Sequence, residues 1–330
     1  MANMNSFQRK CSIFVFSCFI FASCNKNIVS TNTGTNIYIA GDNGTNPVLW
    51  KNGTAEILSS SIGSASQVII SGNDVYIAGV DGESSDLIPA GPSGQYLYWK
   101  NGIQNNIGSL RFLLFYSAIS VIGNNVYYSN SNLWENGIMI VLPGQGSGHI
   151  VSSFAIGNDL YVAGSDSVGD AVYWKNGKLN VVAQGYYPTY NSGSDPSVSC
   201  MYVSGNDVYI GGTNIDNIGV YWKNGEADYL QSSTGNSDIA NVRSIFVLGN
   251  DVFIAGSIFS GSNIAPVYWK NGIQNILPLN GATYGSSLSI FVSGYDIYVA
   301  GYTSDGAVYW KNGIETVLSS QGNANSIYVH

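Results

Sequence analysis

Residues 171–182 read AVYWKNGKLNVV, and the tetrapeptide WKNG inside them recurs along the chain, intact or in close variants. A second motif, GNDVYIAG at residues 72–79, precedes most copies of the tetrapeptide with a similar sequence. A catalytic residue is seldom needed so many times, so the repeat indicates architecture rather than chemistry. All seven tryptophans belong to copies of the tetrapeptide: Trp50, Trp99, Trp134, Trp174, Trp222, Trp269 and Trp310.

The repeat predicts short antiparallel strands. Its tryptophans are 35 to 49 residues apart, and a period of about 40 to 50 residues built from strands is typical of β-propellers. In the sixth repeat we expect strands at 244–247, 252–255, 267–270 and 273–277. The Asn-Gly pair between the last two strands predicts a type I′ turn, in which both central residues need positive φ.

The tryptophans are expected to be packing residues. Apolar residues follow one another in the second and third strands instead of alternating, which indicates that both faces of each sheet are covered. Repeated sheets can cover one another only by packing face to face. We therefore expect each tryptophan to lie between neighbouring sheets, with its indole N–H hydrogen-bonded nearby.

The two ends of the repeat array are offset. The phrase IYIAG at residues 37–41 begins as a second strand, whereas SIYV at residues 326–329 matches first strands such as SIFV at 244–247. We predict an all-β domain over residues 36–330, a seven-bladed β-propeller of four-stranded antiparallel blades. The C-terminal strand pairs with the N-terminal strands, and this closure removes free edges.

The pattern resembles the seven-bladed propellers of the NHL and Kelch type. The sequence of the first two strands and the turn between them resembles that of NHL repeats. Ile-Gly-Gly at residues 210–212 is similar to the glycine pair of Kelch repeats. The chain lacks a regular Kelch Gly-Gly, and its Tyr-Trp pairs stand side by side. The resemblance implies the fold and says little of function, because propellers host many activities.

The N-terminus reads as an export signal. Arg9 and Lys10 precede an apolar run at residues 12–21, followed by FASC at residues 21–24, which describes a signal peptide over residues 1–23. The FASC ending resembles a bacterial lipobox and implies that Cys24 is acylated, with a linker over residues 24–35. The alternative is an ordinary signal peptide in which Cys24 is incidental. The lipid would be the only membrane attachment, at the outer membrane or surface of the bacterial cell envelope.

Charge and cysteine usage limit the partners. The net charge is -8, and without Arg9 and Lys10 it becomes -10, which argues against nucleic acid and against an anionic membrane face. Of the four cysteines, two lie in the signal and Cys24 is the lipidation candidate, so Cys200 is left alone. No disulfide framework is expected.

The candidate binding residues lie in the loops that vary in length. In propellers of this type the first-to-second and third-to-fourth strand turns share one face, here called the tight-turn face, and the other loops share the variable-loop face. Second-to-third loops are expected to range from residues 131–132 to residues 80–96, and long fourth-to-first loops are expected at 108–117 and 183–197. Loops of this kind commonly carry function. The candidate residues for glycan or protein recognition are Arg111, Phe115, Tyr116, Tyr186, Tyr187, Tyr190 and Tyr284.

Two alternatives to this recognition surface stay open. The apolar segment 112–115 could instead cap the edges of the blades, and the tyrosine-rich loop could be structural. The rival function is a hydrolase or lyase that acts at the channel mouth. Three or more polar or ionisable groups that converge at the variable-loop mouth of the channel would favour that rival.

Several kinds of chemistry have few residues to support them. After the signal, the chain keeps only His149 and His330, which disfavours a catalytic triad or a histidine-ligated metal. Only Arg111 and Arg243 remain as arginines, too few for a sialidase-like arginine cluster. Residues 81–86 are rich in acids but lack EF-hand spacing, and we interpret them as a solvated loop. No metal and no cofactor are expected.

The lysine of WKNG is expected to pair with an aspartate on the neighbouring strand. If Asp296 to Ala300 run antiparallel to Lys311 to Ala307, each aspartate stands directly opposite a lysine. The third repeat replaces both partners, with Asn125 and Glu135. The expected pairs are Asp74 with Lys100, Asp159 with Lys175, Asp207 with Lys223, Asp251 with Lys270 and Asp296 with Lys311.

Overall fold

A computed structural model describes residues 34–83, 93–109, 117–185, 195–230, 239–261 and 263–330 of the chain. The chain divides into a unit of residues 1–34 and a unit of residues 35–330, of which the second is described below. The signal peptide and Cys24 lie outside the described residues. Among the described residues, no helix is long and apolar enough to cross a membrane.

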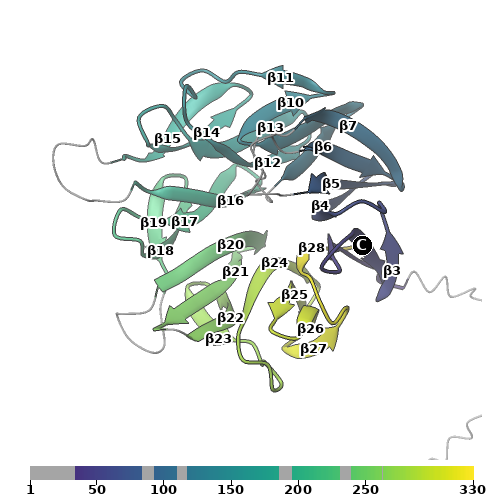
Figure 1. Cartoon of the computed structure of the whole chain (residues 1–330). Helices are drawn as coiled ribbons and strands as arrows, with labels where there is room; N and C mark the ends of the chain where they lie inside the picture. The colour runs from purple at the N-terminus through teal and green to yellow at the C-terminus, as the bar shows by residue number, and fades with distance from the viewer. Residues whose placement is uncertain (1–33, 84–92, 110–116, 186–194, 231–238, 262) are drawn as a thin grey trace, which may run out of the picture. The chain divides into compact units, whose positions relative to one another are not determined.

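The unit of residues 35–330 is a ring of seven four-stranded antiparallel sheets (Figure 1). This confirms the all-β, seven-bladed propeller. Blade 1 consists of β28, β1, β2 and β3 from the inside outward, and blades 2 to 7 follow with four consecutive strands each. Each chain segment thus runs from the centre of the ring to its rim.

The strand bounds follow the same order in every blade. The innermost strands, in blade order, are β28 (Ala324–Val329), β4 (Gly63–Ser71), β8 (Ala118–Ile122), β12 (Ile150–Ile156), β16 (Ser197–Ser204), β20 (Ile239–Leu248) and β24 (Gly285–Ser293). The second strands are β1 (Ile37–Asp42), β5 (Asp74–Glu83), β9 (Asn125–Asn130), β13 (Asp159–Ser165), β17 (Asp207–Thr213), β21 (Asp251–Ser260) and β25 (Asp296–Thr303). The third strands are β2 (Pro47–Lys51), β6 (Ser93–Lys100), β10 (Asn132–Glu135), β14 (Ala171–Lys175), β18 (Gly219–Lys223), β22 (Asn263–Lys270) and β26 (Gly306–Lys311). The outermost strands are β3 (Thr54–Ile57), β7 (Ile103–Ser109), β11 (Ile138–Ile140), β15 (Lys178–Ala183), β19 (Glu226–Tyr229), β23 (Ile273–Ile276) and β27 (Ile314–Val317).

The Asn-Gly turns take the predicted conformation. In blade 6, Asn271 has φ +51° and Gly272 has φ +78°, so both central residues of the two-residue turn are in the left-handed region. All seven turn asparagines lie between φ +48° and +52°. Asparagine and glycine tolerate this conformation at little cost, and so the pair can be repeated in every blade.

The tryptophans pack between blades, as predicted. Six of the seven are buried, with exposed fractions of 4% or less, and Trp134 is half-buried. The indole N–H of Trp174 donates to the carbonyl of Pro143 at 2.8 Å, and that of Trp310 donates to the carbonyl of Pro278 at 3.0 Å. Within the described part of the chain, the indole nitrogens of Trp99 and Trp134 have no hydrogen-bond partner. The expected indole partner is therefore not present in every blade.

The ring closes as the sequence predicts. Strand β28 pairs antiparallel with β1, with Val329 opposite Ile37 and Ile327 opposite Ile39. The backbones of Asn36 and His330 exchange two further hydrogen bonds, at 2.7 and 2.9 Å. The last strand of the chain thereby supplies the innermost strand of the first blade.

The second-to-third loops are shorter than predicted. In blade 2 the ladder extends to Glu83 and Ser93, so residues 80–83 and 93–96 are strand and not loop. In blade 3 Asn130 pairs with Asn132, which leaves only Ser131 to turn, at φ +54°. Backbone pairing continues as long as both strands stay extended, whatever their side chains. The polar residues in this stretch indicated a loop, so the sequence did not predict that the strands continue.

Candidate functional site: the central channel and the face around it

Over the described residues, the tight-turn face carries five ion pairs, and all five are the predicted ones. The lysine Nζ to aspartate Oδ2 distances are 2.8 to 2.9 Å, with side chains 36–45% exposed. These contacts are called the turn-face ion pairs below. In blade 7 the pair joins Lys311 and Asp296.

The predicted register of these pairs is wrong. Lys311 stands opposite Tyr298 and not opposite Asp296, and the equivalent shift occurs in each of the other four blades. Asp296 pairs with Ser293 of the innermost strand, beyond the end of the third strand. The long lysine side chain crosses the ring of Tyr298, 5.1 Å from its centroid, to reach the carboxylate diagonally.

The turn asparagine completes each of these contacts. In blade 7, the Asn312 side-chain amide donates to Asp296 Oδ1 at 2.7 Å, and its oxygen accepts the backbone N–H of Ile297 at 2.8 Å. Blade 3 keeps the arrangement without the acid, since Asn136 bonds both Asn125 and the backbone of Val126. The asparagine therefore ties the third-to-fourth turn to the second strand.

Hydrogen bonds lower the pKa of every aspartate in these pairs. The lysine is the larger cause for Asp74, Asp251 and Asp296, and the asparagine is the larger cause for Asp159 and Asp207. The five lysines and five aspartates of these pairs are thus engaged with one another. Their arrangement supports a structural role for the tight-turn face.

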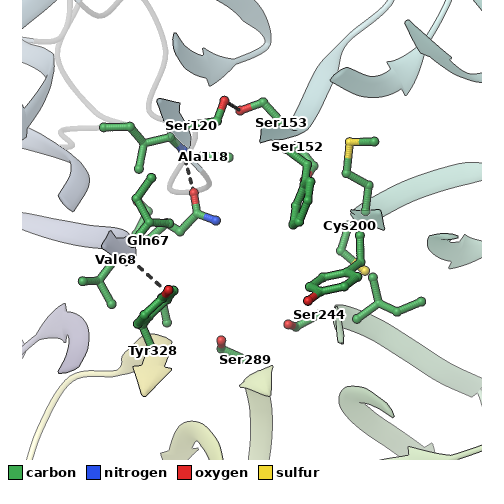
Figure 2. A pocket seen from close by; sticks show the side chains of 18 of the residues that line it. Gln67, Val68, Ala118, Ser120, Ser152, Ser153, Cys200, Ser244, Ser289 and Tyr328 are labelled. Atoms are coloured by element: carbon green, nitrogen blue, oxygen red, sulfur yellow. Dashed lines mark hydrogen bonds between the residues drawn. The ribbon is translucent and has the colours of Figure 1, made fainter. Parts of the chain in front are cut away.

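A cavity of about 620 Å³ runs along the ring axis and is lined by the innermost strands of all seven blades (Figure 2). Such a volume suits a small organic ligand. The lining side chains also connect the blades: Ser326 Oγ accepts the backbone N–H of Val68 at 3.2 Å, and Gln67 Oε1 accepts that of Ile119 at 2.6 Å. Each bond joins one innermost strand to that of the next blade.

A β-bulge interrupts the innermost strand in six of the seven blades. Each bulge inserts one residue without a cross-strand partner, on the side of the channel nearer the variable loops. Among these inserted residues, Arg243 of blade 6 brings a positive charge to the lining. The six inserted residues are Ser66, Val151, Ser199, Arg243, Leu288 and Asn325.

Deeper in the channel, five aromatic rings form a continuous arc. Consecutive rings lie 4.6 to 5.0 Å apart, centroid to centroid, with tilts of 45° to 56°. The same level holds Ile69 in blade 2 and Ser120 in blade 3. The aromatic arc consists of Phe154, Tyr202, Phe246, Phe291 and Tyr328, from blades 4, 5, 6, 7 and 1.

The titratable groups that line the cavity keep fixed protonation states near neutral pH. Burial raises the pKa of the Cys200 thiol to about 12, and burial also raises the pKa of Tyr202 and Tyr328. These groups can donate hydrogen bonds, but none is poised to exchange a proton at pH 7.

The bulge level of the lining holds more than the three polar or ionisable groups that were set as the criterion in favour of a hydrolase or lyase. Four polar side chains, those of Ser66, Ser199, Arg243 and Asn325, lie at the bulge level of the lining. Asn325 is already bonded to Ser64 Oγ and to the carbonyl of Ala65, both at 2.9 Å. The mouth is therefore polar enough to bind, and among the described lining residues Arg243 is the one charged group.

Of the predicted binding residues, the structure places Tyr284. It lies between β23 and β24 with 45% of its surface exposed, while its carbonyl accepts the backbone N–H of Ser304 at 2.9 Å. The backbone is thus anchored and the ring is available. The other six predicted binding residues lie outside the described residues: Arg111, Phe115, Tyr116, Tyr186, Tyr187 and Tyr190.

The acidic stretch 81–86 is only partly described. Asp81 to Glu83 belong to β5, which corrects the expected solvated loop, and Asp81 Oδ2 accepts the hydroxyl of Ser59 at 3.1 Å. Over the described residues, no group of three or more histidine, cysteine, aspartate or glutamate side chains is arranged to hold a metal ion.

The sequence matches no protein-family model and no curated protein. The assignment of the fold and of the candidate site therefore depends on the residues of this chain. The propeller is established by its seven blades, and the type of repeat belongs to the proposals below.

Proposed function

We propose that the protein is a binding module without catalytic activity, which recognises a glycan or a protein through its variable-loop face. The observation that carries this proposal is the chemistry of the channel lining. Burial raises the pKa of Cys200, Tyr202 and Tyr328, so these groups of the lining stay protonated at neutral pH. A hydrolase or lyase needs a group that gives and takes a proton near its working pH.

The contrast between the two faces supports the same function. The tight-turn face repeats one set of internal contacts in blade after blade, with a lysine bonded to an aspartate in five blades. The variable-loop face carries the irregular segments and the half-exposed ring of Tyr284. Tyrosine gives a large contact area at low entropic cost, which suits recognition.

The proposed location is the surface of a bacterial cell envelope. The evidence is the sequence of residues 1–24, with Arg9 and Lys10 before an apolar run and the FASC ending. A lipid on Cys24 would hold the propeller at the membrane, and residues 24–35 would act as the linker. The proposed repeat type remains NHL-like or Kelch-like, on the sequences of the first two strands and on Ile-Gly-Gly at residues 210–212.

A screen of the 35–330 fragment against a glycan array, and in pull-downs from envelope extracts, tests this proposal. Blade 7 offers a matched pair of variants, because Tyr284 lies on the variable-loop face and the fully exposed Tyr295 lies on the tight-turn face. We expect Tyr284→Ala to weaken binding of the captured ligand and Tyr295→Ala to leave it unchanged. If the protein cleaved a captured glycan, the proposed binding role would be wrong and the hydrolase or lyase alternative would be right.

A further inference from the structure

The channel lining is not sevenfold symmetric, although the blades are. The aromatic arc covers five consecutive blades, with Phe246 of blade 6 at its centre. Smaller side chains, those of Ile69 and Ser120, occupy the same level in blades 2 and 3. All five rings of the arc are partly exposed and border the cavity of about 620 Å³. The arc therefore forms one apolar wall, and a ligand has room between it and blades 2 and 3.

A row of hydroxyl groups lies beside this apolar wall. In four blades a serine precedes the aromatic residue by two positions, so the two side chains share one face of the strand and start about 6.6 Å apart along it. Figure 2 shows the hydroxyl groups of Ser244 and Ser289 turned toward the channel. The serine row consists of Ser152, Ser244, Ser289 and Ser326, which precede Phe154, Phe246, Phe291 and Tyr328.

The serine row keeps donors available to a ligand. The Oγ atoms of Ser244, Ser289 and Ser326 each accept a backbone N–H of the next blade, at 3.1 to 3.3 Å. A serine hydroxyl that accepts in this way still has its proton to donate. The row thus holds the blades together and also presents hydroxyl donors to the channel.

Two tyrosine hydroxyls and one amide add to these groups. Among the described residues, the hydroxyls of Tyr202 and Tyr328 have no hydrogen-bond partner. Burial raises the pKa of Tyr202, and the charge that Tyr328 would carry when ionised raises it further, so the two hydroxyls lie near each other. Gln67 accepts the backbone N–H of Ile119 through Oε1, and Figure 2 shows its amide nitrogen directed toward the middle of the channel.

This lining favours one kind of ligand over two others. A wholly apolar molecule would displace water from the hydroxyl groups and leave them without a partner, which is unfavourable. An anion would need a free positive charge, whereas Arg243, the one charged residue of the described lining, already has an interaction partner, and its charge would repel a cation. A neutral ring that carries hydroxyl groups suits both the apolar and the polar part of the wall.

We propose that the channel binds a neutral sugar ring, with the C–H groups of the ring against the aromatic arc and its hydroxyl groups bonded to the serine row, to Gln67 and to the two tyrosine hydroxyls. The C–H groups gain dispersion contacts with the aromatic rings, and each sugar hydroxyl can both donate and accept. The cavity volume of about 620 Å³ is in the usual range for small ligands. This inference rests on the proposed binding function and deepens it, since it names a class of ligand and the place where the ligand is held.

Two sources share this chemistry. One is a free sugar, and the other is the terminal residue of a glycan. They differ at the anomeric carbon, which carries a hydroxyl group in a free sugar and a glycosidic bond in a glycan. A methyl glycoside reproduces the second case in a small molecule.

The test is a titration of the full-length purified protein, followed by ligand-observed NMR. The probes are glucose, galactose, mannose and N-acetylglucosamine, each also as its methyl glycoside, and the control is cyclohexanemethanol, a ring with a single hydroxyl group. We expect at least one sugar to bind with a Kd of about 1 mM or below, and about tenfold or more tightly than the control, because the control leaves most of the polar groups unpaired. Binding of the methyl glycoside as well would identify the end of a glycan, and its loss would identify the free sugar.

Variants of the arc assign the site. We expect Phe246→Leu, which removes the central ring, to weaken sugar binding about tenfold. The double variant Tyr202→Phe with Tyr328→Phe, which keeps both rings and removes two hydroxyl groups, should have an effect of the same order. Tyr295→Phe makes the same chemical change on the tight-turn face, and it should leave binding unchanged. Thermal melts show whether each variant is folded, and the double variant decides if Phe246→Leu fails to fold, because it breaks no hydrogen bond among the described residues.

Two results would overturn the inference. One is wild-type protein that binds none of the sugars, or binds none more tightly than cyclohexanemethanol. The other is sugar binding that is unchanged in the folded variants of the arc. In either case, an array ligand whose binding is lost in Tyr284→Ala and kept in Phe246→Leu would leave the proposed function standing. Conversely, a sugar that binds in the channel, together with no ligand that depends on Tyr284, would keep the inference and overturn the role proposed for the loops.

Discussion

Removal of Ser326 to His330 should abolish cooperative folding, because it takes away most of β28 and opens the ring. Ile327 and Val329 are buried, with 4% and 5% of their surfaces exposed. Burial of an aliphatic side chain of this size contributes about 1.5–3 kcal/mol, so the two together contribute about 3–6 kcal/mol. The ring of Tyr328, 5.0 Å from that of Phe291, adds about 0.5–1.5 kcal/mol.

The backbone cost adds to this sum. Without residues 326–329, the inner edge of β1 loses its ladder partners over Ile37 to Ala40. The Ser326 hydroxyl that accepts the backbone N–H of Val68 is lost as well. The total of at least about 4–8 kcal/mol is comparable with the whole stability of a typical domain, about 5–15 kcal/mol.

The assay is a circular-dichroism melt and a urea titration of the truncated and parent chains. A single substitution, Ile327→Ala, should cost about 2–5 kcal/mol and give an intermediate midpoint. His330→Ala is the matched control, since the exposed His330 contributes through its backbone. A truncated chain with the midpoint of the parent would refute the reasoning, because the ring would then not depend on this strand.

Three further predictions concern the anchor, the turn-face ion pairs and the loops. Cys24→Ser should move the protein out of the membrane fraction and abolish incorporation of labelled palmitate; a wild-type chain that takes up no label would contradict lipidation. The aspartates of the turn-face ion pairs have lowered pKa values, so their stabilisation is complete above the unfolded-state pKa of about 3.9 and is lost as the pH falls through the lower folded-state pKa. The urea midpoint of the parent chain should therefore fall as the pH is lowered from about 6 to about 2.5. The midpoint of a variant with all five aspartates changed to asparagine should fall less. An equal fall in both chains would show that the ion pairs are not the cause. Tyr186, Tyr187 and Tyr190 changed together to alanine should weaken a loop-face ligand by about 1–2 kcal/mol or more per anchoring ring, with an unaltered melt, and unchanged affinity would place the site elsewhere.

The fold could be predicted because its signals are local and repeated. The Asn-Gly of each turn fixes a two-residue hairpin, and the positive φ of Asn271 and Gly272 shows the reason directly. The offset ends of the array indicate closure by residues 326–329. The register of the turn-face ion pairs was harder, because a lysine can reach a diagonal neighbour as easily as an opposite one.

The candidate site was mostly hidden in the sequence. Phe246 reads as a core residue in the word SIFV at 244–247, and only the ring of blades shows that it faces a channel with four other aromatic residues. Arg243 lies at a bulge, where the alternation of faces shifts by one residue. An aromatic residue recurs at the third position of SIFV at 244–247 and of its counterparts in other blades. This recurrence was a signal in the sequence that could have predicted the arc.

The pairing of β28 with β1 also determines when the protein can become a ring. Val329 and Ile37 are partners, so the first blade lacks its innermost strand until residues 324–329 have been synthesised. Blades 2 to 7 are made of consecutive hairpins and can form one by one, whereas closure joins distant segments and is expected to be slow. If the chain is exported as proposed, we expect translocation to precede ring closure, and resistance to proteases to appear only after β28 has paired with β1.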